Sequence, residues 1–362
     1  MFVAWRDLKF AKGRFALMAT VIVLITLLVG LLSGLTAGLG RQNTSAITGL
    51  PADRIAFAAP GEGQSLSYAD SAVTETQWRH WTAEVGAAGA QRLGISTTRA
   101  AAGNRSAAVS AFGVQPGSPL APEGGAVTER SVVLSTTAAA DLDLHPGDAF
   151  ALAGQQLSVA AVAGDASFSH LPVVWTSLDV WRKTAPPAGG RPGPAATVLA
   201  LTTTSGADLA ATDRAAGTTT VTKDDSLSAI GSYRSENGSL QLMRGFLFAI
   251  SALVIGAFFT VWTIQRSGDL AVLKALGATT ADLLKDALGQ AVVLLVGGTL
   301  AGTGLAAGIG AAITGSAVPF VLTPATVLVP AAVIILLGAL GAALSIRRIT
   351  SVDPLTALGT LR

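Results

Sequence analysis

The sequence contains no cysteine, and this absence excludes both a disulfide framework and a thiolate metal site. Charged residues are also few, at 13% of the 362 positions, whereas about a quarter is usual in a soluble domain. Three long runs carry no charge at all: residues 15–39, 245–264 and 287–346. A membrane-spanning helix needs about 20 apolar residues, and the third run is long enough for two. The sequence therefore predicts four transmembrane helices, at 15–39, 245–264, 287–313 and 325–346.

A phosphate-binding loop of the form G-x-x-x-x-G-K-[ST] is also absent, and the pair Gly-Lys occurs nowhere in the chain. We therefore expect that this chain is not an enzyme and that any ATP it depends on is bound by a partner subunit. The predicted spans contain no Asp, Glu, Lys or Arg, which argues against a carrier coupled to protons or sodium. Each of the three histidines, His80, His145 and His170, lacks the spacing of a metal or hydrolase motif, so we expect no metal and no intrinsic cofactor.

Basic residues flank the spans unevenly, and this predicts the orientation. They precede the first span, lie between the second and third, and follow the fourth: Arg6, Lys9, Lys12, Arg14; Arg266, Lys274, Lys285; Arg347, Arg348, Arg362. By the positive-inside rule, both termini and the loop 265–286 lie on the cytoplasmic side of the plasma membrane. The first run is expected to be a retained anchor and not a cleaved signal peptide.

The same rule places residues 40–244 and the turn 314–324 outside the cell, and the tail 347–362 inside. In residues 1–14, Trp5 and Leu8 alternate with basic residues, which predicts an amphipathic helix in the inner interface; the alternative is a simple positive flank.

The long external region has the composition of an α+β domain. Short runs such as RIAFAAP, SVVLST and PVVWTS read as strands punctuated by Gly and Pro, and residues 67–87 have helical spacing. The Pro- and Gly-rich stretch 113–125 suggests a boundary between an α/β lobe and a mostly β lobe. The fold class predicted is thus an α-helical membrane bundle with a large extracellular α+β domain.

The segment QRSGDLAVLKALGATTADLLK, residues 265–285, separates two apolar runs and has a stripe of leucines at Leu270, Leu273, Leu276 and Leu284. It predicts a short helix at the inner face of the membrane, to which a cytoplasmic partner can bind, with a break at Gly277. The alternative is a simple connector.

This segment resembles the R-x-x-E-[IL]-A-[VL]-[LR]-[KR]-A-[LI]-G-A sequence of the FtsX/MacB-type permeases of ABC transporters, and RRITSVDPLTAL is similar to their closing R-x-x-x-x-x-P-x-x-A-L signature. Asp269 stands where that family often has Glu. The resemblance covers the membrane parts, about half of the chain. It implies one span, an external domain and three further spans, working in the lipid bilayer as a homodimer beside a cytoplasmic ATPase dimer, with no role for nucleic acid. It also implies a coupling helix that docks on the ATPase, formed by Ser267, Gly268, Asp269, Leu270, Leu273, Lys274, Leu276 and Gly277.

The stretch SYRSENGSLQLMRGF, residues 232–246, enters the second span with several polar side chains. Carboxylate, thioether and cationic groups at this depth can hold an amphiphile with an apolar plane and acidic edges, and haem is such a molecule. The alternative is an ordinary interfacial belt. The candidate binding residues are Glu236, Tyr233, Met243, Arg244 and Gln241, with Glu236 the first candidate for an iron ligand.

The short chain without a fused ATPase resembles the haem-exporting permeases of that family, so the resemblance implies haem as the exported substrate. Two other functions stay open. One is export of another amphiphile or a peptide, and the other is transmembrane signalling to a cell-wall hydrolase.

Overall fold

The computed structural model describes residues 12–123, 126–184, 193–203, 206–265, 268, 277, 279–313 and 318–350. The chain divides into two compact units, which are described separately below. The membrane unit comprises Met1–Gly38 and Ser239–Arg362, and the β-rich unit comprises Leu39–Gly238.

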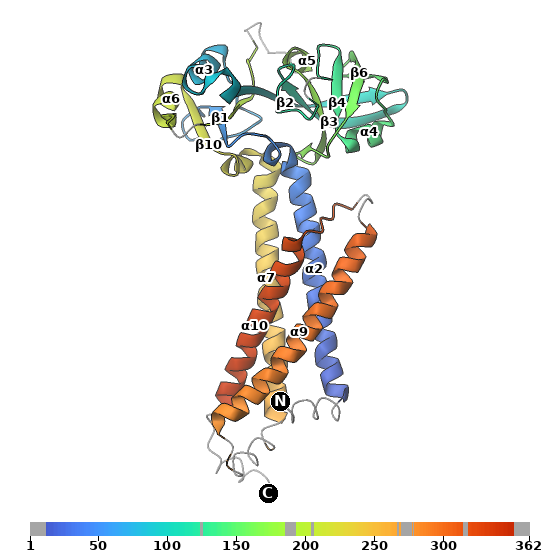
Figure 1. Cartoon of the computed structure of the whole chain (residues 1–362), viewed down its shortest axis with the longest axis vertical. Coiled ribbons are helices and arrows are strands. Elements are labelled where there is room, and N and C mark those ends of the chain that lie inside the picture. The colour runs from blue at the N-terminus through green and yellow to red at the C-terminus, as the bar shows by residue number, and fades with distance from the viewer. Residues whose placement is uncertain are drawn as a thin grey trace. The chain divides into compact units, whose positions relative to one another are not determined.

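Four of the described helices are long and apolar enough to cross a membrane, as predicted. They are α2 (Lys12–Thr48), α7 (Gly231–Gln265), α9 (Thr280–Ile313) and α10 (Pro324–Thr350) (Figure 1). Helix α2 continues past Leu39, where the predicted span ends, and α7 begins well before residue 245. Hydropathy marks only the apolar part of a helix, so polar turns at its ends are missed.

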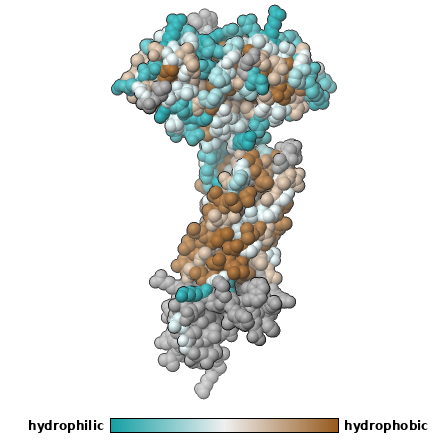
Figure 2. Space-filling model, in the orientation of Figure 1, coloured by the Kyte–Doolittle hydropathy of each residue, from teal (hydrophilic) through white to brown (hydrophobic). Residues whose placement is uncertain are grey.

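Apolar side chains cover the visible face of the spanning helices (Figure 2). Leu253, for example, is 72% exposed, a degree of exposure that suits a side chain facing lipid. Inside the unit, glycines let the helices approach closely, as small residues do in membrane bundles. A Cβ at Gly302 of α9 would lie 2.6 Å from the Val23 carbonyl oxygen of α2.

Phe320, in the connection between α9 and α10, occupies the space that a side chain would need at Gly34 of α2 and at Gly310 of α9. The backbone N–H of Val321 donates to the Gly34 carbonyl at 3.1 Å. The connection is therefore fastened to α2 by a ring contact and a hydrogen bond.

The β-rich unit contains ten strands among its described residues. They are β1 (Arg54–Ala58), β2 (Ala90–Ala102), β3 (Arg105–Val114), β4 (Ser131–Leu134), β5 (Ala149–Leu152), β6 (Gln155–Val162), β7 (Ser167–Phe168), β8 (Leu171–Ser177), β9 (Val198–Leu201) and β10 (Thr218–Thr222). The strand order is β10-β1-β9-β2-β3-β8-β4-β6-β5, β7 pairs with β8, and β5 pairs back to β2. The six strands from β2 to β5 thus close into a ring, which leaves a small barrel with a core that includes Val109, Leu134 and Phe150.

A second lobe is built from β10, β1, β9 and the first residues of β2, with α3 (Glu75–Gly89) and α6 (Leu209–Ala216) packed beside it. Its core is centred on Trp81, which is fully buried. Two lobes are therefore present, but the stretch 113–125 does not separate them. Its described residues, 113–123, end β3 and continue after it, and β3 and the next strand, β4, both belong to the barrel lobe. The lobes are instead joined by β2, whose early residues pair with β9 and whose later residues pair with β3 and β5.

One packing feature of the barrel involves two glycines. Gly94 of β2 is paired directly with Gly113 of β3. Trp181, in α5 (Leu178–Thr184), occupies the space that a side chain would need at either position, and a Cβ at Gly113 would lie 2.5 Å from the Trp181 Cβ. The glycine pair therefore forms a slot for this indole, which is only 5% exposed.

Candidate functional site

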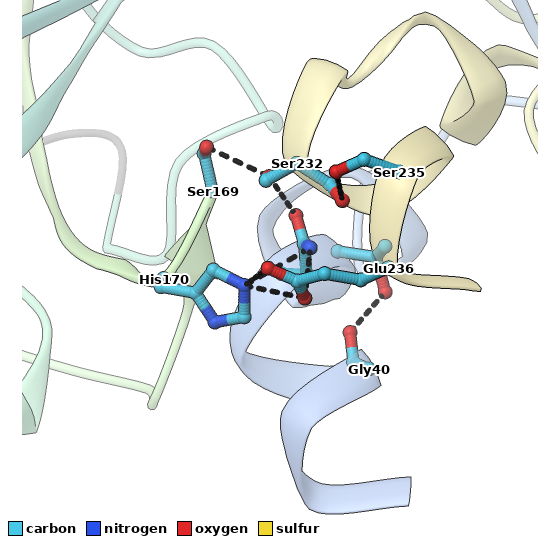
Figure 3. A network of polar contacts seen from close by, with 8 residues as sticks. Gly40, Ser169, His170, Ser232, Ser235 and Glu236 are labelled. Carbon is cyan, nitrogen blue, oxygen red and sulfur yellow. Dashed lines mark hydrogen bonds and ion pairs between the residues drawn. The ribbon is translucent and has the colours of Figure 1, made fainter. Parts of the chain in front are cut away.

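Glu236, the first candidate from the sequence, lies near the start of α7 within the β-rich unit, and its carboxylate is part of a polar network (Figure 3). His170 Nε2 lies 3.0 Å from Glu236 Oε1 and 2.9 Å from Oε2. When Glu236 is ionised, its carboxylate only accepts hydrogen bonds, so in that state the ring nitrogen is the donor to Glu236. The same nitrogen also lies 3.2 Å from the Asn43 side-chain nitrogen, so its role towards each partner depends on the histidine tautomer. The Glu236 side chain is 41% exposed and the His170 side chain is 30% exposed, so the carboxylate is accessible to a ligand.

Asn43, near the end of α2, supplies the second contact to the carboxylate. Its side-chain nitrogen lies 3.4 Å from Glu236 Oε2. Ser232 donates to the Asn43 side-chain oxygen at 2.7 Å. The amide nitrogen is left for Glu236, whose carboxylate only accepts when it is ionised. Since Asn43 is 1% exposed, its polar atoms need such partners.

The network joins three parts of the β-rich unit. Asn43 belongs to α2, Ser232 and Glu236 belong to α7, and His170 lies between β7 and β8. Ser169 adds a further bond, because its hydroxyl lies 2.9 Å from the hydroxyl of Ser232. The site is therefore assembled from segments that are distant in the sequence, and Figure 3 shows the His170 ring directed at the Glu236 carboxylate.

The connection from β7 to β8 has an unusual backbone. Phe168 pairs with Leu171, so Ser169 and His170 form a two-residue turn. Their φ angles are +51° and +65°, and positive φ at both positions is the mark of a type I′ turn, which favours Asn-Gly. A non-glycine residue in this region costs roughly 1 kcal/mol or more.

The turn is held against α2 by its own backbone. The Ser169 N–H donates to the Asn43 carbonyl at 3.0 Å, and the His170 N–H donates to the Gln42 carbonyl at 3.2 Å. The strained residues are thus the ones that contact α2 and Glu236, and strain placed in this way is typical of functional positions.

The other predicted binding residues lie elsewhere. Tyr233 packs against the main core of the β-rich unit and is partly buried. Gln241, Met243 and Arg244 follow on α7 but belong to the membrane unit, so the network described above contains none of them. Met243 is 49% exposed, and the Arg244 guanidinium lies 5.8 Å from the ring centre of Phe248.

Sequence reasoning missed His170 and Asn43. Nothing near His170 in the sequence marks it as a partner of Glu236. Glu236 is 66 positions away, and a separation of this length leaves no local motif.

Most of the predicted coupling helix lies outside the described residues, namely Ser267, Asp269, Leu270, Leu273, Lys274 and Leu276. Gly268 is exposed. Gly277 has a φ of +96°, a conformation that favours glycine.

Within the described ranges, no group of three or more His, Asp or Glu side chains could enclose a metal ion. What the network offers is a single accessible carboxylate with a nitrogen donor fixed beside it.

Residues 242–354 match the FtsX-like permease C-terminal family. Over 361 residues, 99% of each chain, the sequence is 23% identical to a protein of Staphylococcus haemolyticus named hemin transport system permease protein HrtB. The protein of the same name from Staphylococcus epidermidis (strain ATCC 12228) is 32% identical over 144 residues, which cover 40% of this chain and 41% of that one. Among solved structures, the periplasmic region of MacB from Actinobacillus actinomycetemcomitans aligns with a TM-score of 0.33 at 12% identity, covering 49% of this chain and 92% of that one.

Proposed function

We propose that this chain, which contains an FtsX-like permease domain at residues 242–354, is the permease subunit of an ATP-driven pump that exports haem. The observation that carries the proposal is the Glu236 carboxylate, kept partly exposed and oriented by His170 and Asn43. Similarity to a hemin transport permease over the whole length supports the same substrate.

Haem suits this site on chemical grounds. Haem iron takes an oxygen ligand from tyrosine in some haem proteins, and here the Glu236 carboxylate would supply that oxygen. The haem propionates can pair with arginine. Glu236 has two oxygens, so one can ligate iron while the other keeps the hydrogen bond from His170. In a homodimer, each protomer would supply one Glu236. Tyr233 and Met243 are the alternative candidates for the iron ligand. Arg244 and Gln241, on the same helix, are the proposed polar contacts to haem.

Energy would enter from a separate ATPase dimer on the cytoplasmic side, because the chain has no phosphate loop of its own. We propose that Ser267–Ala278 docks on that ATPase, with Asp269 and Lys274 as polar contacts. Closure of the ATPase would then move the transmembrane helices, and this movement would expel haem from the outer leaflet of the plasma membrane. The absence of acidic and basic residues in the predicted spans supports such a mechanical route over an ionic relay.

The test is a haem titration of the full chain in lipid nanodiscs, followed by the Soret band. The wild type should give a saturable Soret shift, and Glu236→Ala should weaken binding at least tenfold. Glu129→Ala is the matched control, because Glu129 is an exposed carboxylate in the same unit, and it should behave as the wild type.

A cellular assay separates the substrate from the residue. Cells that express the chain with its ATPase should survive added haem, whereas Glu236→Ala cells should not. Equal Soret shifts in wild type and Glu236→Ala would remove the Glu236 assignment. Protection against a different amphiphile instead of haem, or a cell-chaining defect without any change in toxicity, would replace haem export by one of the other two functions.

A further inference from the structure

We propose that His170 is a positioning residue for Glu236, and that the Ser169–His170 turn belongs to the substrate site. This inference rests on the proposed function and adds a residue that the sequence did not place among the binding candidates. It starts from the contrast between the backbone of this turn and the residues found in it.

A two-residue turn with positive φ at both positions is made most easily by Asn-Gly. The chain contains a second turn of this kind, Ala153–Gly154 between β5 and β6, with φ angles of +49° and +80°. That turn has glycine at its second position and no polar side chain. The turn between β7 and β8 has Ser169 and His170, and both side chains are used, the first on Ser232 and the second on Glu236.

The geometry shows how His170 would act. Its Nε2 is almost equally distant from the two Glu236 oxygens, at 3.0 and 2.9 Å. Iron bound to one oxygen leaves the other for His170, which would then fix the direction of the ligating oxygen, as hydrogen-bond partners of metal ligands commonly do.

His170 is not placed to be the opposite axial ligand in the same protomer. Two ligands on opposite sides of an iron lie about 4 Å apart, since each metal–ligand bond is about 2 Å long. The observed separation of 2.9 Å is too short for that arrangement. His170 therefore acts through Glu236.

Three variants of the full chain in nanodiscs test the inference. Ser169→Asn/His170→Gly gives the turn its preferred sequence and removes both side-chain contacts. His170→Gln keeps an N–H donor of similar reach. Ala153→Asn makes the same Asn-Gly turn between β5 and β6, where Glu236 is not contacted, and is the matched control.

We expect the Asn-Gly turn at 169–170 to weaken haem binding about tenfold, the lower end of the range for partners of metal ligands. His170→Gln should stay within about threefold of wild type, since it retains the hydrogen bond. Ala153→Asn should bind as wild type. Wild-type affinity in the 169–170 variant would overturn the inference while leaving Glu236 as the ligand. A loss in His170→Gln equal to that in the double variant would also overturn it, because the imidazole itself would then be required.

A second measurement does not depend on haem. Hydrogen exchange of residues 235–238, without haem, should be faster in the 169–170 variant than in wild type or Ala153→Asn, because α7 has lost two side-chain contacts. Unchanged exchange would overturn the positioning role. If the wild type fails to bind haem at all, the proposed function falls, whereas faster exchange would still support the contact between turn and helix.

Discussion

The glycine slot for Trp181 makes a quantitative prediction about the β-rich unit. In Gly94→Ala the new methyl group would meet the Trp181 ring directly. The ring also lies against Gly113, the cross-strand partner of Gly94, so it has little freedom to move aside. Overpacking of a buried site costs about 1–3 kcal/mol, and we expect the upper half of this range, about 2–3 kcal/mol.

This loss should be visible as a lower unfolding temperature. For a domain of roughly 150–250 residues, each 1 kcal/mol shifts the midpoint by about 2–4 °C, so the expected decrease is about 4–12 °C. The assay is thermal unfolding of the full chain in nanodiscs, followed by the β-sheet band in circular dichroism. Gly206→Ala is the control, because Gly206 is exposed and a Cβ there meets nothing within 4 Å.

A double-mutant cycle identifies the cause. Trp181→Ala alone should cost about 3–5 kcal/mol. Together with Gly94→Ala it should cost less than the sum, because the added methyl group enters the vacated space, and the coupling should be about 1–2 kcal/mol. Additive effects, or a Gly94→Ala midpoint equal to that of Gly206→Ala, would show that the ring does not occupy the slot.

Three further predictions concern other parts of the chain. Tyr68→Phe removes a buried hydrogen bond of 2.9 Å to Ser226 and should cost about 1 kcal/mol in urea unfolding. Burial raises the pKa of the Tyr68 hydroxyl above its ordinary value, so as the pH rises the unfolded chain loses this proton at a lower pH than the folded chain does. The free energy of unfolding should therefore fall above about pH 10 in the wild type but not in Tyr68→Phe. Asp213→Ala should cost about 1–3 kcal/mol, because the Thr220 N–H and hydroxyl, both 2.9 Å from Asp213, would lose their acceptor; Asp213→Asn should cost less in the same urea assay. Lys274→Glu should lower haem-stimulated ATP hydrolysis by the complex while haem binding stays at the wild-type level, and an unchanged rate would remove Lys274 from the coupling contact.

The membrane part of the fold could be predicted from the sequence because its signal is local. A charge-free run long enough to span a bilayer is uncommon outside membrane proteins. Each of the four charge-free spans falls within one of the helices α2, α7, α9 and α10. The polar ends of these helices were not predicted, since residues such as Asn43 and Glu236 continue the helix without adding to the hydropathy.

The β-rich unit was harder to predict because its organisation depends on pairing between distant strands. The individual runs are strand-like, but nothing in the sequence shows that one strand, β2, serves both lobes. The candidate site has the same difficulty. Glu236 could be selected because it precedes an apolar run, whereas His170 becomes informative only when the turn and its positive φ angles are known.

The fastening of Phe320 has a consequence for motion in the membrane unit. A ring enclosed by Gly34 on one helix and Gly310 on another must be withdrawn before those two helices can part. We infer that Phe320 keeps α2 and α9 together when the membrane unit changes conformation. Any opening within the bundle would then form between other helices, and a cross-link between α2 and α9 would leave the activity of the permease unchanged.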